Sequence, residues 1–178
     1  MDLQAILAQG VGLVATCIAF LSFQCKDTRK LFLYQMLSAA VWALHFGLLG
    51  ASTGLLLNVA GMIRCIFLYN ADKRWARSNV SMVLVTLLMA VCGIITWSGW
   101  ICVLPIIAMV VGTPVMWQQK GKLLRWVQLF IISPFWLIYN ISNASIAGIL
   151  TESLNMISVV VSLVRFRNQK LENGEKQA

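Results

Sequence analysis

The chain has 178 residues, of which 60% are apolar and 11% are charged, and its mean hydropathy is +0.81. This composition is typical of polytopic membrane proteins and excludes a soluble domain with an ordinary core. The formal net charge is +8, but the basic residues lie on short turns and form no separate module for nucleic acid. We therefore expect membrane lipid as a partner, with anionic lipid at the cytoplasmic face, and no nucleic acid.

Apolar stretches long enough to form helices follow one another along the chain. They cover residues 6–23, 31–49, 54–69, 80–97, 101–117, 126–141 and 148–164. Several are close to the lower limit for crossing a hydrocarbon core of roughly 30 Å, so flanking residues must complete them. The sequence therefore predicts an all-α integral membrane protein with seven transmembrane helices.

The basic residues predict the orientation of these helices. Nearly all of them fall into residues 24–30, 70–79, 118–125 and the C-terminal tail, and the connectors in between contain no Lys or Arg. Because Lys and Arg resist translocation, basic connectors stay cytoplasmic. With seven spans, the N-terminus is expected in the periplasm and the C-terminus in the cytoplasm.

The two halves of the chain follow the same plan. A shift of 94 residues places Gln24 on Gln118 and Trp42 on Trp136. A second three-helix unit with the same orientation needs one intervening helix, so we expect a 3+1+3 arrangement of two parallel repeats, whose interface is a common place for substrate sites. The predicted parts are residues 1–70 (first repeat), 71–98 (cytoplasmic loop and linker helix), 99–166 (second repeat) and 167–178 (disordered cytoplasmic tail). The alternative is a set of seven apolar helices with accidental similarity.

Three ionisable side chains fall inside predicted spans: His45, Arg64 and Glu152. A charge in hydrocarbon costs about 3 kcal/mol even on the translocon scale, so such residues normally face the bundle interior or a water-filled cavity. Arg64 either pairs with Glu152 or extends its side chain toward the cytoplasm. His45 either faces a pathway or donates a hydrogen bond to a neighbouring span, and a lone histidine gives no reason to expect a metal site.

Trp42 and Trp136 lie in the middle of spans, outside the aromatic belts expected at the two interfaces. Each precedes a polar residue of the next helix by sixteen positions, Asn58 and Glu152 respectively. Since the two helices run in opposite directions, each pair is expected at one depth. Indole faces that stack on a sugar-like solute, with the polar groups on its hydroxyls, explain this pattern. The alternative is that both tryptophans pack between helices, with Asn58 as an interhelical hydrogen-bonding group.

Motifs in both halves carry a family resemblance. FLSFQ, RKL, W-x2-HF-x-LLGA-x-TG and N-x2-G-x2-R, at residues 20–64, resemble the YgjV-type bacterial inner-membrane protein family. The patterns SFQCK...W-x2-H...N-x2-G and WQQK...W-x2-Y...E-x2-N are similar to the PQ-loop superfamily of SWEET-like (MtN3-like) carriers. The resemblance implies a 3+1+3 helix fold around a central pathway in the bacterial inner membrane.

The resemblance also assigns candidate residues. It implies a substrate site at Trp42, Asn58, Trp136 and Glu152, with the neighbouring motif positions His45, Tyr139 and Asn155, and a cytoplasmic gate at Gln24, Gln118, Arg64 and Pro114. The chain departs from the pattern at Phe23 and Trp117, which replace prolines, and at Glu152, which replaces an amide. The missing prolines make hinge motion at the cytoplasmic gate less expected, and the carboxylate in place of an amide makes sugar less expected as the substrate.

These features favour a carrier for a small polar metabolite, sugar-like or of another kind, in which proton exchange at Glu152 is one way to couple transport. The alternative is a non-transporting scaffold that binds a partner protein or lipid, and a homo-oligomer is compatible with both. We expect no enzyme, because the spans contain no second carboxylate and the spacing gives His45 no Ser or Cys partner. We expect no cofactor and no metal.

Overall fold

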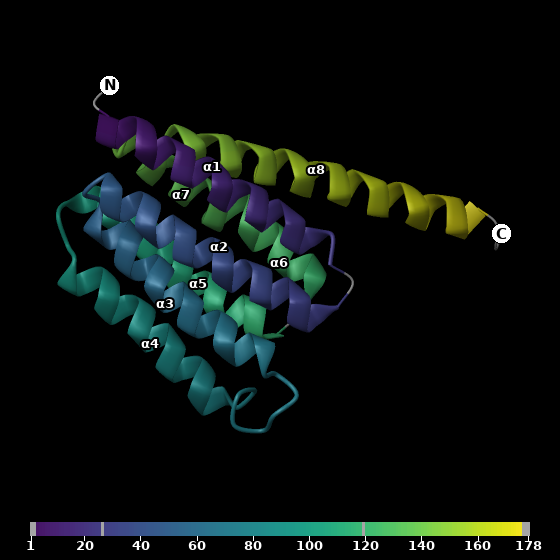
Figure 1. Cartoon of the computed structure of the whole chain (residues 1–178). Helices are drawn as coiled ribbons and strands as arrows, with labels where there is room; N and C mark the ends of the chain where they lie inside the picture. Colours follow the sequence, from purple (N-terminus) through teal and green to yellow (C-terminus); the bar gives the residue numbers. More distant parts are fainter. Residues whose placement is uncertain (1–2, 26, 119, 176–178) are drawn as a thin grey trace.

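The computed structural model describes residues 3–25, 27–118 and 120–175, and these residues form helices joined by short connectors, with no strand among them (Figure 1). The helices are α1 (Leu3–Phe23), α2 (Thr28–Leu48), α3 (Ser52–Tyr69), α4 (Asn79–Ile95), η1 (Trp100–Cys102), α5 (Val103–Gln118), α6 (Gly121–Val127), η2 (Gln128–Ile132), α7 (Ser133–Ser142) and α8 (Ile146–Glu175). The prediction of an all-α protein is confirmed.

Helices occur at all seven predicted positions. In the described part of the chain, six helical segments are long and apolar enough to cross a membrane: Leu3–Ser22, Thr28–Leu48, Ser52–Tyr69, Trp100–Gln118, Lys122–Ser142 and Ile146–Val164. The remaining helix, α4, is apolar but has only 17 residues. At a rise of 1.5 Å per residue it extends about 26 Å, close to the shortest length that crosses a bilayer.

The sixth span is not a uniform α-helix. It consists of α6, the π-helix η2 and α7, with Pro134 in the first turn of α7. Proline has no N–H to donate, and its ring crowds the carbonyl four residues earlier, so the regular hydrogen-bond ladder cannot continue through it. The residue one repeat earlier is Ala40, and α2 runs past it without a break. The two proposed repeats therefore differ in their middle helix.

Most of the helices form a closed ring. The helices α1, α2 and α3 pack side by side in that order, as do α5, α7 and α8, and α3 packs against α5. Contact between α1 and α8 closes the ring (Figure 1), and here the hydroxyl oxygens of Thr16 and Thr151 lie 2.7 Å apart. The helix α4 packs on α3 and α5 and lies at the edge of the bundle.

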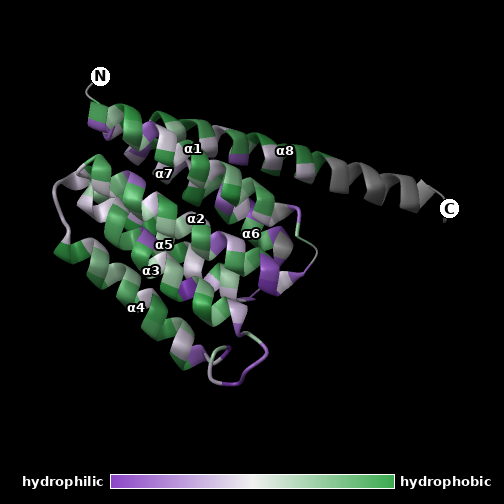
Figure 2. Cartoon of the chain, viewed as in Figure 1, coloured by the Kyte–Doolittle hydropathy of each residue, from purple (hydrophilic) through white to green (hydrophobic). Residues whose placement is uncertain are grey.

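The helices are largely apolar along their length, and the α3–α4 connector is mostly hydrophilic (Figure 2). Large apolar side chains face outward on several helices, among them Leu84 at 60% and Val161 at 60% exposed. An exposed apolar surface of this extent indicates a lipid environment. The α1–α2, α3–α4 and α5–α6 connectors lie at one end of the bundle, and the N-terminus lies at the other (Figure 1).

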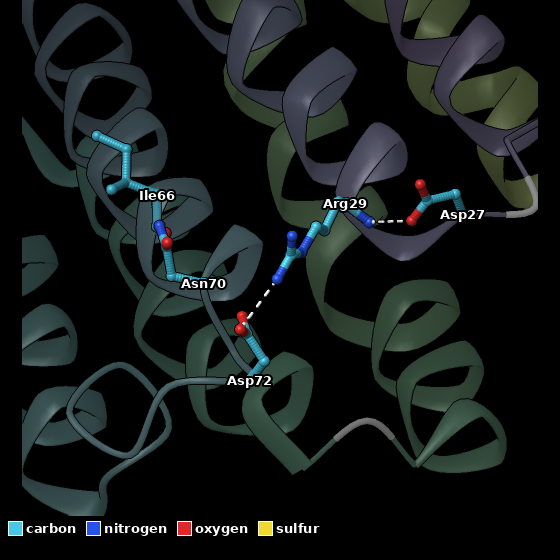
Figure 3. A network of polar contacts seen from close by, with 5 residues as sticks. All are labelled: Asp27, Arg29, Ile66, Asn70 and Asp72. Carbon is cyan, nitrogen blue, oxygen red and sulfur yellow. Dashed lines mark hydrogen bonds and ion pairs between the residues drawn. The ribbon is translucent and has the colours of Figure 1, made fainter.

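Two of the basic connectors are joined to each other. Asp27 accepts a hydrogen bond from the backbone N–H of Arg29 at 2.9 Å and caps α2. The guanidinium of Arg29 in turn pairs with Asp72, in the α3–α4 connector, at 2.9 Å (Figure 3). Both side chains of this ion pair are more than half exposed. Such surface pairs stabilise a fold by at most about 1 kcal/mol, so this contact aligns the connectors more than it stabilises the bundle.

The C-terminal helix α8 is the longest, with 30 residues. It extends beyond the other helices and remains helical to Glu175 (Figure 1). The disordered tail predicted for 167–178 stays a prediction, and 176–178 lie outside the described residues. Residues 149–173 contain neither Gly nor Pro, so no residue in this stretch is a strong helix breaker.

Candidate functional site

A cavity of about 440 Å³ lies inside the ring of helices. Its walls include residues from α1, α2, α3, α5, α7 and α8, and none of the described residues that line it belongs to α4. Cavities of this size are typical of sites for small molecules. The predicted site residues that line it are Trp42, Asn58, Arg64, Trp136, Glu152 and Asn155.

An aromatic cluster forms one wall of the cavity. The ring of Phe46 lies 5.8 Å from the ring of Trp42 and 5.7 Å from that of Trp136, measured between centroids. Phe46 is only 2% exposed. It therefore packs against both indoles in this conformation, and a solute that stacks on either indole has to share the wall with it.

Several amide side chains and one carboxylate provide hydrogen-bonding groups in the cavity. Asn58 donates to the carbonyl of Gly54 in its own helix at 2.8 Å. Asn155 lies one turn after Glu152 on α8 and donates to its carboxylate over 3.5 Å. The hydroxyl of Ser133, at the start of α7, is a further polar neighbour of this carboxylate. The predicted pairs of Trp and polar residue thus share one cavity.

Arg64 approaches the cavity from α3. Its Nη1 lies 3.4 Å from the hydroxyl oxygen of Thr113 and 3.9 Å from the sulfur of Met109, both on α5. Thr113 donates its own proton to the Met109 carbonyl, so its oxygen is left to accept from Arg64. No ion pair within 4.0 Å joins Arg64 to Glu152, both of which are described residues. Arg64 and Glu152 therefore line the same cavity without the direct ion pair that the sequence left open.

His45 lies outside the lining of the cavity and is completely buried. Its Nδ1 is 2.7 Å from the Ala8 carbonyl oxygen and its Nε2 is 2.7 Å from the Ser145 hydroxyl. A carbonyl can only accept, so Nδ1 carries the proton, and in the neutral ring Nε2 accepts from Ser145. Of the two interpretations of His45, hydrogen bonding to neighbouring helices is the one seen here.

Tyr139 is also buried away from the cavity, and its hydroxyl accepts a hydrogen bond from the backbone N–H of Gly54 at 2.8 Å. It thereby joins α7 to α3. An added Cβ at Gly54 would lie 2.6 Å from the ring of Phe46 on α2, so only glycine allows α3 to lie this close to that ring. His45 and Tyr139 act in this conformation as structural links between helices.

The predicted gate residues do not converge. Gln24 and Gln118 are exposed at the basic end of the bundle, and neither lines the cavity. Pro114 is partly buried inside α5, next to Thr113. Of this group only Arg64 reaches the cavity, and the role of the other three as a gate stays a prediction.

A family model described as Imp-YgjV, a bacterial inner membrane protein, matches residues 6–170 of the chain. The chain belongs to this family. It is also similar to the inner membrane protein YgjV of Escherichia coli K12, with 28% identity over 165 residues, 92% of this chain and 87% of the relative. No solved structure matches. With its apolar helices, this Imp-YgjV family member is a multi-pass protein of the bacterial inner membrane.

The match to the Imp-YgjV family includes every described residue that lines the cavity, from Ala19 to Ser162. The structure adds lining residues that the sequence did not single out, notably Phe46 and Gln128. Phe46 follows Trp42 by four positions, which places both on one helix face, but His45 at three positions is an equivalent neighbour, so this spacing does not single out Phe46. Gln128 lies in the π-helix, and an isolated polar residue at the edge of a span gives no comparable signal.

Proposed function

We propose that this Imp-YgjV family member is a small SWEET-like (PQ-loop-like) carrier that moves a small polar metabolite by rocking two three-helix units around the central cavity. The observation that carries the proposal is that Trp42, Asn58, Trp136 and Glu152, selected by their repeated spacing, line one cavity. The proposal assigns no enzymatic activity.

The packing of the ring supports a parallel repeat. The first helix of each unit packs against the third helix of the other, α1 on α8 and α5 on α3. Two units related by an axis along the membrane normal make such reciprocal contacts. The helix α4, which packs on both α3 and α5, returns the chain to the side where the second unit must begin.

We propose a periplasmic N-terminus and a cytoplasmic C-terminus, because the basic connectors share one end of the bundle. The cavity lining then extends toward the cytoplasm through Gln35, Leu124 and Arg125. The contacts of His45 with Ala8 and Ser145 lie toward the periplasmic end. This arrangement corresponds to a conformation that is closed to the periplasm.

Glu152 is the proposed coupling residue. A carboxyl group that gains and loses a proton as the cavity opens to each side would tie solute movement to proton movement. Its described neighbours are Asn155 and Ser133, and it lacks a basic partner within ion-pair distance among the described residues. A carboxyl group held by neutral partners is free to change its protonation state without breaking a salt bridge.

Thiol accessibility provides the first test. In a cysteine-free background, Asn58→Cys and Glu152→Cys place thiols in the cavity, and Val59→Cys places one on the outer surface of α3, where Val59 is 38% exposed. A membrane-impermeant thiol reagent should label positions 58 and 152 from the cytoplasmic side and leave position 59 unlabelled in lipid. Unlabelled cavity positions would refute a water-filled pathway.

Flux in liposomes provides the second test. The purified protein is reconstituted and assayed with labelled sugars, amino acids and organic acids, and Trp42→Ala and Trp136→Ala should each abolish the flux of any solute that is carried. A second candidate function, a scaffold for a partner protein or lipid, is favoured by the packing of Phe46 on both indoles. The scaffold predicts that Trp42→Ala changes stability or association, with no solute transported by the original protein.

A further inference from the structure

Arg64 is the only basic residue placed inside a predicted span, and it lines the cavity. A guanidinium remains charged at every accessible pH, and removal of an ion from water is strongly unfavourable unless a countercharge or a full set of hydrogen bonds replaces the water. The surroundings of Arg64 therefore have to provide such compensation, or a ligand has to bring it.

The protein itself compensates this guanidinium weakly. Nη1 approaches a neutral hydroxyl at 3.4 Å and a thioether sulfur at 3.9 Å, both at the long end of hydrogen-bonding distance, and the thiol of Cys65 is a further weak polar neighbour of the guanidinium. The Nε atom is buried and has no hydrogen-bond partner among the described residues. No carboxylate of the described residues lies within 4.0 Å of the Arg64 guanidinium.

The other polar groups of the cavity are mostly neutral. They include Asn58, Gln128 and Asn155, while Glu152 is the acidic residue of the lining and Arg125, toward the basic end of the bundle, is its second basic residue. A guanidinium in a partly enclosed site recognises planar carboxylate and phosphate groups through paired N–H donors. The cavity of about 440 Å³ leaves room for such a group together with a small polar body.

We propose that Arg64 binds an oxyanion, so that the solute of this carrier is a small metabolite with a carboxylate or phosphate group at one end and hydroxyl or amine groups at the other. The anionic end lies on Arg64, and the polar end lies toward Asn58, Glu152 and Asn155. This inference rests on the proposed carrier function and narrows its substrate from any small polar metabolite to an anionic one.

The test uses the full-length protein in detergent micelles without added lipid. Acetate, lactate, succinate and inorganic phosphate are the oxyanion probes, glucose and glycerol are the uncharged probes, and chloride keeps the ionic strength constant. The readout is the shift of the unfolding temperature with probe concentration. Arg29→Gln is the matched control, because Arg29 is exposed and pairs with Asp72 outside the cavity.

At least one oxyanion should raise the unfolding temperature of the original protein and of Arg29→Gln. Arg64→Gln should weaken that response by about tenfold to a hundredfold in apparent Kd, the factor that corresponds to one charge-assisted hydrogen bond. Arg64→Lys keeps the charge but loses the planar fork, so an intermediate response is expected. If Arg64→Gln does not fold, Arg64→Lys is compared with the original protein in its place.

A headgroup of an anionic lipid offers the same oxyanion chemistry as a free solute. Nanodiscs of phosphatidylcholine, with and without phosphatidylglycerol, separate the two sources. An Arg64-dependent stabilisation by phosphatidylglycerol assigns the oxyanion to lipid, and an Arg64-dependent stabilisation by soluble probes assigns it to a solute.

An equal oxyanion response in Arg64→Gln, or no oxyanion response in the original protein, would overturn the inference. Binding of glucose alone would leave the carrier proposal intact, whereas unlabelled thiols at 58 and 152 would refute that proposal separately.

Discussion

The imidazole of His45 and the hydroxyl of Ser145 are 2.7 Å apart, although 100 positions separate them in the chain. Through its other nitrogen His45 also holds the carbonyl of Ala8. One buried ring thus joins α1, α2 and the turn that precedes α8. Since α8 belongs to the second half of the chain, these hydrogen bonds tie the two halves together at the end of the bundle opposite the basic connectors.

Replacement of His45 by Ala should destabilise the protein by about 2 to 4 kcal/mol, because it leaves a cavity and two buried groups without partners. Ser145→Ala should cost about 1 to 2 kcal/mol, and the double variant should cost less than the sum of the two. Denaturation in detergent micelles measures these differences. Ser142→Ala is the control, because its exposed hydroxyl bonds only within α7; equal losses at 142 and 145 would contradict the assignment.

Two glycines of α1 provide a matched pair. An added Cβ at Gly12 would lie 2.6 Å from the Ala147 Cβ and 2.7 Å from His45 Nδ1, whereas one at Gly10 would meet nothing within 4 Å. Gly12→Ala should therefore force α1 away from α8 and destabilise the protein by about 1 to 3 kcal/mol. Gly10→Ala should be neutral or stabilising by up to about 1 kcal/mol, since Ala favours the helix. Thermal unfolding of both variants in the same detergent decides the comparison.

The depth of residues in the membrane could be predicted from the sequence, but their rotation about the helix axis could not. Trp42 and Asn58 line one cavity, as expected from sixteen residues counted across a turn between antiparallel helices. His45 and Phe46 both lie about one turn after Trp42, and only contacts with other helices decide which of them faces the cavity. Ala8 and Ser145 hold His45 away from it, and neither partner can be identified from sequence spacing.

The same limit applies to Arg64 and to the sixth span. The neighbours of Arg64 on another helix include Met109 and Thr113, and these contacts depend on the packing of α3 against α5 and not on any local pattern. Pro134 does mark a break in the sequence. Whether the chain kinks there or widens into a π-turn depends on how the freed carbonyl groups are satisfied by the surrounding structure.

Phe46 offers a test of how the cavity is closed. Phe46→Ala removes the ring that packs on Trp42, Trp136 and Tyr139, so a thiol at position 58 should become accessible to an impermeant reagent from the periplasmic side. Phe46→Leu keeps most of the volume and should leave that thiol protected. Phe130→Ala is the control, because Phe130 is 61% exposed on the surface of the bundle. Protection that survives Phe46→Ala would place the closure elsewhere.

Glu152→Gln separates the proton exchange of Glu152 from its size and shape. The variant keeps the length of the side chain and can still accept a hydrogen bond from Asn155 on the same helix. If Glu152 carries the coupling proton, the variant should still exchange solute across liposomes at equal pH on both sides. Accumulation driven by a pH gradient should fall to the level of protein-free vesicles, because a neutral amide cannot take up or release a proton. Asp72→Asn is the control, since this carboxylate is exposed and pairs with Arg29 outside the cavity. Accumulation that persists in Glu152→Gln would assign the coupling to another group and leave Glu152 as a hydrogen-bonding residue of the site.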